Sequence, residues 1–202
     1  MSVHSKDTKE WQTKLERIGK LSKQEKETVF NNLGHCIEIE SLRQVYRELD
    51  GKKAVGVDGV TKERYGMRIK ENLKELLRRI RIGSYKAKPA RIVEIPKEDG
   101  SKRPLAISCF EDKIVQAMVS KILTKIYEPM FLPCSYGFRE DHSCHEALRE
   151  LKKHVHEKKD GAIVEIDIRK YFNSIPHQPM MEILRKKITD EKFLKLVEKL
   201  IT

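Results

Sequence analysis

The chain has 202 residues, of which 39% are hydrophobic and 36% are charged, so it is long enough for one or two domains with a sizeable core. No apolar run approaches the roughly 20 residues of a membrane span, which argues against a membrane partner. The four cysteines form no C-x-x-C pair, and no signal peptide precedes them. These features predict a cytoplasmic protein with reduced thiols.

The formal net charge is +11, and most of the surplus lies in one segment. From Lys62 to Arg103 there are 14 Lys and Arg against 6 Asp and Glu. Such a surface favours a polyanionic partner, because Lys and Arg gain affinity by releasing counterions from phosphates. A merely solvated basic face is the alternative. The candidate contacts within the segment are Arg78, Arg79, Arg81, Lys86 and Lys88.

The first third of the chain is predicted to be helical. One helix carries Trp11, Leu15 and Ile18 at helical spacing. A capping box at 22–25 is expected to begin a second helix, which Gly34 would end. A third helix is expected to carry four apolar side chains and to end at Asp50-Gly51. Those side chains are Leu42, Val45, Tyr46 and Leu49.

The residues 56–61 predict a turn that ends in a helix-capping threonine, followed by one amphipathic helix from Tyr65 to Ile80. Two short strands should then flank the turn at 98–101, because Asp-Gly tolerates the positive φ of a tight hairpin. The tip of this hairpin carries Lys97, Lys102 and Arg103. Such cations either decorate a soluble edge or reach over a phosphate group.

Two more capping boxes, at 108–111 and 143–146, are each expected to begin a helix. The first helix should end at Pro129, and an aromatic loop at 131–139 follows it. The second should direct a stripe of four side chains inward, namely Ala147, Leu148, Leu151 and Val155. A zinc site is a weak alternative for this region, because the spacing of the candidate ligands fits no standard pattern. The candidate ligands are Cys134, His142, Cys144 and His145.

The residues 162–168 alternate as a β-strand does, with Val164, Ile166 and Ile168 on one face and Glu165 and Asp167 on the other. A carboxylate at the end of such a strand can bind a hard cation such as Mg²⁺. A half-buried strand with solvated acids is the alternative. Helical patterns return after Pro176 and continue to the last residue, which suggests an excised piece of a longer protein.

The order of several motifs is more specific than any one of them. This order closely resembles that of the reverse transcriptases encoded by bacterial group II introns, which also act as splicing maturases. Retron, diversity-generating and CRISPR-associated reverse transcriptases share parts of the same set. The motifs are Gly56-x-Asp58-Gly59-x-Thr61, Ile95-Pro96-Lys97, Arg103-Pro104-Leu105-x-Ile107, Asp112–Gln116, Glu128-Pro129-x-Phe131, Ser135–Arg139, Asp167-Ile168 and Tyr171-Phe172.

The resemblance implies a helix-rich α+β fold with a small antiparallel sheet, arranged as a right-hand polymerase. Residues 1–50 would form an N-terminal helical extension, 51–160 the fingers and 161–202 the start of a truncated palm. The resemblance also implies roles for single residues. Asp167 would be the catalytic carboxylate that holds two Mg²⁺ ions, and the backbone carbonyl of Ile168 would be a further metal ligand. Phe172 would be the steric gate, the aromatic ring that excludes a 2′-hydroxyl. Lys97 and Arg103 would bind the triphosphate of the incoming dNTP.

One departure from the family pattern is large, because no Asp-Asp pair occurs in the sequence and the second catalytic motif is therefore absent. We expect a fragment with an incomplete two-metal site that is inactive alone. The implied partners are intron RNA, an RNA template with a DNA primer, and dNTP. The alternative is a non-catalytic RNA-binding scaffold for splicing. Apolar surface left uncovered on the Asp167 strand or the last helix would favour a homodimer.

Overall fold

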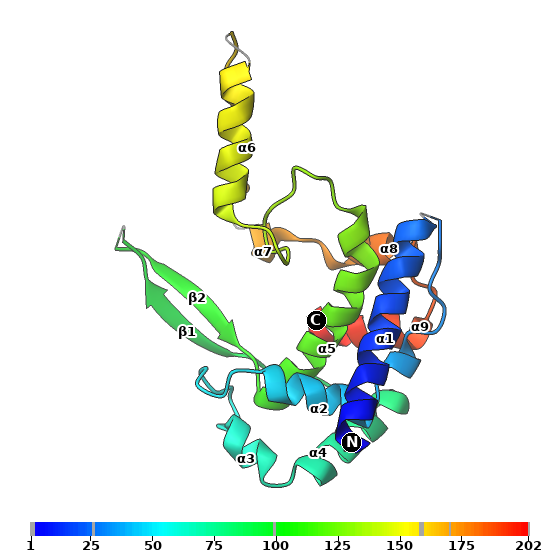
Figure 1. Cartoon of the computed structure of the whole chain (residues 1–202). Coiled ribbons are helices and arrows are strands. Elements are labelled where there is room, and N and C mark those ends of the chain that lie inside the picture. The colour runs from blue at the N-terminus through cyan, green and yellow to red at the C-terminus, as the bar shows by residue number, and fades with distance from the viewer. Residues whose placement is uncertain (1–2, 26, 99, 158–159, 170, 202) are drawn as a thin grey trace.

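The computed structural model describes residues 3–25, 27–98, 100–157, 160–169 and 171–201. It is rich in helices and contains a two-stranded antiparallel sheet, as the predicted fold class requires. Figure 1 shows the arrangement of these elements. In chain order they are α1 (Val3–Gln24), η1 (Gly34–Cys36), α2 (Ile39–Glu48), α3 (Lys62–Gly66), α4 (Ile69–Arg81), β1 (Arg91–Pro96), β2 (Lys102–Ile107), α5 (Phe110–Tyr127), η2 (Glu128–Met130), α6 (Cys144–Glu157), α7 (Tyr171–Ser174), α8 (His177–Arg185) and α9 (Glu191–Ile201).

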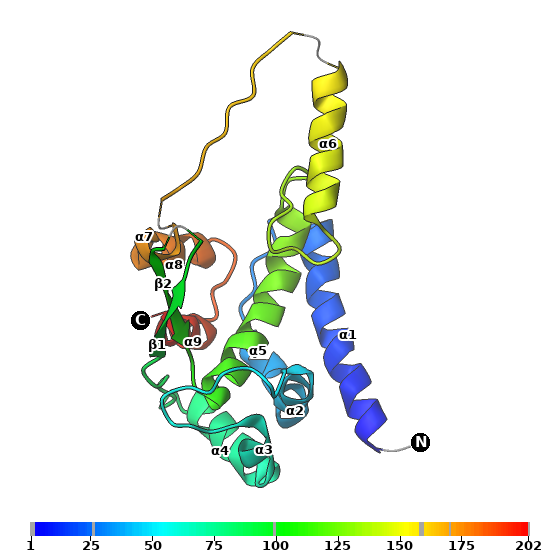
Figure 2. The same cartoon turned by 90° about the vertical axis from the view of Figure 1, so that its left-hand side faces the viewer.

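The core is built around α5. Its side chains Ile114, Met118, Ile122 and Ile126 recur every four residues and are fully buried. α1 runs beside α5 in the same direction in both Figure 1 and Figure 2, and α2, α3 and α9 also contact α5. The predicted apolar stripe of α1 is buried in this contact. One central helix therefore fixes the positions of elements from both ends of the chain.

The expectation of a second helix at 22–34 is wrong. α1 continues through Gln24, and the buried Ser22 hydroxyl donates a 2.5 Å hydrogen bond to the carbonyl of Ile126 instead of capping a helix. Phe30 forms a parallel bridge with Ile188, flanked by hydrogen bonds to residues 187 and 189. The polar backbone groups of Phe30 are thus satisfied by residues remote in sequence, which a local pattern cannot reveal.

The single helix expected from Tyr65 to Ile80 is two helices, α3 and α4. Thr61 caps α3 as predicted, because its hydroxyl accepts the amide of Arg64 at 3.2 Å. The Asn72 amide group in α4 donates to the carbonyl of Tyr65 at 2.8 Å. This hydrogen bond satisfies a carbonyl at the end of α3, so the chain can turn between the two helices.

α6 begins at the predicted capping box, where Ser143 and Glu146 exchange hydrogen bonds of 2.8 and 3.3 Å. The expectation that its apolar stripe faces inward is wrong, because Leu148, Leu151 and Val155 are exposed. Figures 1 and 2 show α6 standing away from the other helices. None of the described helices is long and apolar enough to cross a bilayer.

Candidate nucleotide and nucleic-acid interface

The predicted hairpin is present as β1 and β2. Ile95 lies opposite Arg103, and Gly100 in the turn has a φ of 77°. Paired residues share a face, so Arg103 lies on the face of Ile95, and Lys97 continues that face into the turn. Both cations are exposed, and neither forms an ion pair with a described residue. The hairpin projects from the helices in Figure 1 and can therefore present both exposed cations to a ligand.

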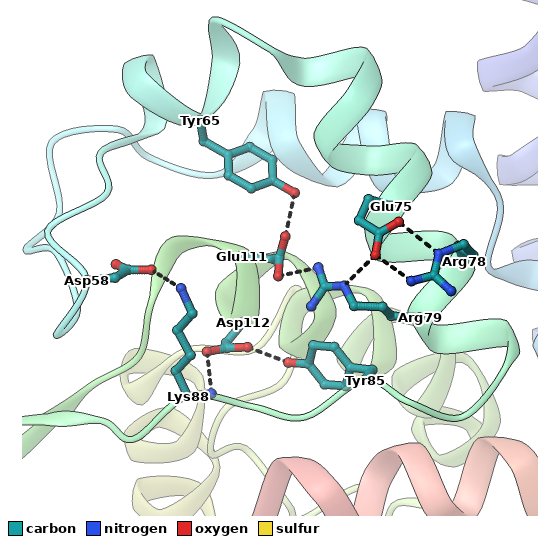
Figure 3. A network of polar contacts seen from close by, with 9 residues as sticks. All are labelled: Asp58, Tyr65, Glu75, Arg78, Arg79, Tyr85, Lys88, Glu111 and Asp112. Carbon is teal, nitrogen blue, oxygen red and sulfur yellow. Dashed lines mark hydrogen bonds and ion pairs between the residues drawn. The ribbon is translucent and has the colours of Figure 1, made fainter.

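The base of the hairpin is fastened to two neighbouring segments. The Arg91 guanidinium donates two hydrogen bonds, of 3.0 and 2.8 Å, to the carbonyl of Val55. The Lys88 ammonium lies 2.9 Å from Asp58, while its backbone amide donates to Asp112 at 3.1 Å (Figure 3). The loop at 54–58 and the first turn of α5 therefore set the direction in which the hairpin leaves the helices.

Two glycines explain the motif that precedes α3. A Cβ on Gly56 would lie 2.5 Å from the Cα of Cys109, so only glycine permits this approach of the two backbones. Gly59 has a φ of 63°, a conformation that side chains with a Cβ rarely adopt. The motif thus places Asp58 within reach of Lys88.

Charge pairing stabilises the ionised forms of Asp58 and Lys88. Partial burial alone would raise the pKa of Asp58, but hydrogen bonds from Lys88 and from the amide of Val60 outweigh it and lower that pKa. The hydrogen bond to Asp58 raises the pKa of Lys88. Both groups are therefore charged at neutral pH.

A second carboxylate, that of Asp112, is only 3% exposed. It accepts a 2.5 Å hydrogen bond from the hydroxyl of Tyr85 as well as the Lys88 amide. Burial and this hydrogen bond raise the pKa of Tyr85, so the phenol stays protonated and acts as a donor. The buried acid is thereby satisfied by two donors on the segment leading to the hairpin (Figure 3).

Glu111 joins α3, α4 and α5. It accepts hydrogen bonds from the Tyr65 hydroxyl at 3.2 Å and the Arg79 guanidinium at 2.6 Å (Figure 3). The expectation that Ser108 and Glu111 form a capping box is therefore wrong. The residue before α5 is Cys109, and no side chain caps that end.

The five cations predicted to contact RNA differ in their surroundings. Arg78 donates two hydrogen bonds to Glu75, at 2.8 and 2.7 Å, while Arg79 and Lys88 are paired with Glu111 and Asp58. Arg81 and Lys86 are exposed and pair with no described carboxylate. Three of the five therefore already have an anionic partner. Their contact with RNA remains a prediction.

The predicted strand that carries Asp167 is absent. Residues 160–169 form an exposed connection with no ladder hydrogen bonds among the described residues, and the side chain of Asp167 is exposed. A strand needs a neighbour for its amide and carbonyl groups, and the described part of the chain offers none here. Ile168 is also exposed. Phe172 packs edge-on against Tyr171 and Phe138, with ring centroids 5.3 and 6.3 Å apart.

The described residues do not assemble a metal site. No group of three or more His, Cys, Asp or Glu side chains gathers among them. The zinc alternative therefore has no support, and the ring of His142 instead lies edge-on to Tyr136 at 5.7 Å. Asp167 likewise lies outside any such group, so the residues in place do not fit a complete two-metal centre.

Arg139 shapes the aromatic loop that precedes α6. Its guanidinium binds Glu128 at 2.8 Å and donates to the carbonyls of Leu132 and Ser135 at 3.1 and 2.7 Å. It also lies over the ring of Phe131. The neighbouring Phe138 has a φ of 58°, and its exposed ring lies beside that of Phe172.

Sequence reasoning assigned no role to Asp58, Asp112, Arg91 or Arg139. The first, second and fourth lie inside motifs that the sequence displays, so the signal was present. Their partners are a lysine, a tyrosine and backbone carbonyls at unpredictable separations along the chain. Only the folded chain identifies these residues as the ones that hold the hairpin base and the aromatic loop.

Residues 95–201 match the family model described as reverse transcriptase (RNA-dependent DNA polymerase). This match covers more than half of the chain, which therefore belongs to the reverse transcriptase family.

Similarity to individual proteins narrows the assignment within the reverse transcriptase family. The chain is 34% identical over 93% of its length to the group II intron-encoded protein LtrA of Lactococcus lactis subsp. cremoris, and covers 31% of that protein. It is 36% identical over 75% of its length to protein YkfC of Escherichia coli, covering 40%. It is 32% identical over 87% of its length to the putative COX1/OXI3 intron 1 protein of Saccharomyces cerevisiae, covering 21%. Within the family, the chain is of the group II intron reverse transcriptase and maturase type.

The chain spans between 21% and 40% of the length of these three relatives.

Proposed function

We propose that the chain forms the fingers and the beginning of the palm of an RNA-directed DNA polymerase encoded by a group II intron. One observation carries the proposal: a member of this family holds Lys97 and Arg103 on one face at the end of a hairpin fastened by its own motif residues, and neither cation pairs with a carboxylate among the described residues. Residues 1–50 would be the N-terminal extension, 51–160 the fingers and 161–202 the start of the palm.

In this proposal the hairpin cations bind the triphosphate of an incoming dNTP. Arg103 offers a planar fork of donors and Lys97 a compact charge, which together suit adjacent phosphates. Phe172 would lie under the sugar and exclude a 2′-hydroxyl. Its exposed ring, supported by Phe138 and Tyr171, is free to contact a nucleotide.

We assign the carboxylate of Asp167 and the carbonyl of Ile168 to Mg²⁺ binding in a longer protein that supplies further carboxylates. No Asp-Asp pair occurs in this sequence, so we expect the 202 residues alone not to extend a primer. A primer-extension assay with an RNA template, a DNA primer, dNTPs and Mg²⁺ tests that expectation.

The decisive experiment uses a longer protein that extends primers. Asp167→Ala should abolish dNTP incorporation and leave RNA binding unchanged, because the side chain is exposed and forms no ion pair with a described residue. Asp160→Ala, an exposed acid at the start of the same connection, is the matched control and should remain active. A fully active Asp167→Ala variant would refute the catalytic assignment.

A second role, binding intron RNA to assist splicing, is favoured by the net charge of +11 and its concentration between Lys62 and Arg103. Binding should weaken steeply as salt rises. Charge reversal at Arg78 and Arg81 should weaken it further. Arg79 is a poor choice for this test, because its reversal would also break the contact with Glu111.

A further inference from the structure

A groove with a cavity volume of about 330 Å³ lies between the end of α4 and α9. Four of its lining side chains are cations, and no carboxylate lines it. An adjoining cavity of about 650 Å³ shares Arg81 and Lys192 with this groove but is also lined by Asp190 and Glu191, so the purely basic lining is confined to the smaller groove. Residues more than a hundred positions apart thus build one basic concavity, in which Arg81 from α4 meets Lys192, Lys195 and Lys199 from α9.

The three lysines lie along one edge of α9. They recur at i, i+3 and i+7, a spacing that places side chains on the same side of a helix. The apolar face of α9 is buried against the core, so this edge cannot rotate away from the groove. Lys199 also donates a hydrogen bond to the carbonyl of Gly83, which joins the two walls.

The cations in this groove have fewer carboxylate partners than most of the five cations that the sequence predicted to contact RNA. Arg78, Arg79 and Lys88 each lie within 2.9 Å of a carboxylate, which a phosphate would have to displace. Arg81 and the α9 lysines Lys192 and Lys195 form no ion pair within the described part of the chain. They can therefore bind an anion without first losing a partner.

We propose that this groove binds the phosphate backbone of an RNA strand through Arg81, Lys192 and Lys195. The inference rests on the proposed RNA-binding role and adds a surface from α9 to it. Arg81, Lys192 and Lys195 offer three positive charges, so together they can contact about three phosphates of the strand. Lysines act as point charges, so the contact is independent of sequence.

The test compares two triple variants of the 202-residue chain in a fluorescence titration with a labelled RNA hairpin. The first is Arg81→Gln, Lys192→Gln, Lys195→Gln, which leaves the structural Lys199 in place. The second is Arg149→Gln, Lys152→Gln, Lys153→Gln, which removes the same charge from an exposed face of α6. Circular dichroism melts verify that both variants fold.

We expect the groove variant to bind about tenfold more weakly or worse, and the α6 variant to stay within about twofold of the parent. The slope of log K against log salt should fall by about two to three for the groove variant, because about three phosphate contacts are lost. Equal weakening in both variants would show an effect of net charge alone and overturn the proposal. Unchanged affinity in a folded groove variant would overturn it too, while leaving RNA binding intact.

Failure of the parent chain itself to bind RNA has a different meaning. In that case the proposed RNA-binding role fails together with the groove. Titration of the parent with vesicles of anionic phospholipid is run in parallel. Binding to vesicles and not to RNA would assign the groove to a membrane surface and would likewise overturn the proposal.

Discussion

Asp190 accepts a hydrogen bond of 2.7 Å from the backbone amide of Leu33, which lies 157 residues earlier in the chain. The same oxygen accepts the amide of Gly34 at 2.9 Å, while the other oxygen accepts the amide of Phe193 at 3.1 Å. One carboxylate therefore caps α9 and also holds the segment before α2.

We expect Asp190→Ala to lower the free energy of unfolding by about 2 to 3 kcal/mol, because a helix cap and two long-range hydrogen bonds to a charged acceptor are lost. Urea unfolding at neutral pH measures the change. Asp160→Ala is the control, since removing that exposed acid should lower the free energy of unfolding by less than about 0.5 kcal/mol. Equal stability of the two variants would contradict the structure.

The same residue should make stability depend on pH. Burial alone would raise the pKa of Asp190, but hydrogen bonds from the amides of Gly34, Phe193 and Leu33 outweigh it and lower that pKa. The stabilisation is therefore complete above the unfolded pKa of about 3.9 and is lost as pH falls towards the folded value. Unfolding curves from about pH 5 to about pH 3 should fall more steeply for the parent than for Asp190→Ala. Parallel curves would show that Asp190 is not the group responsible.

Gly56→Ala tests the close approach of the motif loop to α5. The new Cβ would lie 2.5 Å from the Cα of Cys109 and 2.6 Å from its nitrogen, so backbone must move. We expect a loss of about 3 kcal/mol in the free energy of unfolding, at the upper end of the usual cost of overpacking. Gly137→Ala is the matched control, because nothing lies within 4 Å of its Cβ position. A melt in which both variants match the parent would disprove the close approach.

Tyr85 and Asp112 should be energetically coupled. Asp112→Ala leaves the Tyr85 hydroxyl and the Lys88 amide without their acceptor, so we expect a loss of about 3 kcal/mol. Tyr85→Phe should cost about 1 to 2 kcal/mol, and the double variant should cost less than the sum of both. A double-mutant cycle measured by urea unfolding gives the coupling free energy. A value near zero would rule out a direct hydrogen bond.

The four thiols should divide into two classes. Cys36 and Cys109 are buried, whereas Cys134 and Cys144 are exposed. Burial raises the pKa of the Cys36 thiol to about 11, which further slows its reaction at neutral pH. We expect a colorimetric thiol reagent to label two cysteines quickly in the native chain and all four in denaturant. Rapid native labelling of Cys36 would contradict its place in the core.

Self-association is expected from the uncovered apolar surfaces, although the expectation that the last helix supplies one is wrong, because Phe193, Leu194 and Val197 are buried. The stripe of α6 and the connection after it expose Leu148, Leu151, Val164 and Ile166. Sedimentation at rising concentration should reveal dimers, which Leu148→Gln with Leu151→Gln should weaken. A species that stays monomeric at every concentration would count against this proposal.

The sequence predicted elements well where the signal was local. The Asp-Gly turn predicted the hairpin, and apolar residues recurring every three or four positions predicted α2, α5 and α9. It failed where a distant residue decided the outcome. Ser22 has the chemistry of a cap but donates to the end of α5, and Glu111 has the chemistry of a capping box but binds Tyr65 and Arg79.

The candidate site shows the same division. Lys97 and Arg103 could be assigned to one hairpin because register follows from the turn. The alternation around Asp167 indicated a strand, yet alternation reports only a tendency and cannot supply the neighbouring strand that pairs with it. The groove between α4 and α9 lay beyond prediction, because its cations come from segments that meet only in the folded chain.

The hairpin is held at its base by Arg91, and its tip lies far from that point, so a small change of angle at the base moves the tip by a larger distance. Six residues per strand give it a reach of about 20 Å, so a tilt of about 5° at the base displaces the tip by about 2 Å. Substitutions at Asp58, far from the tip, should therefore alter where Lys97 points without touching it. Substitutions in the loop that contains Asp58 would therefore change the position of the hairpin cations, and with it the affinity for a ligand that these cations bind.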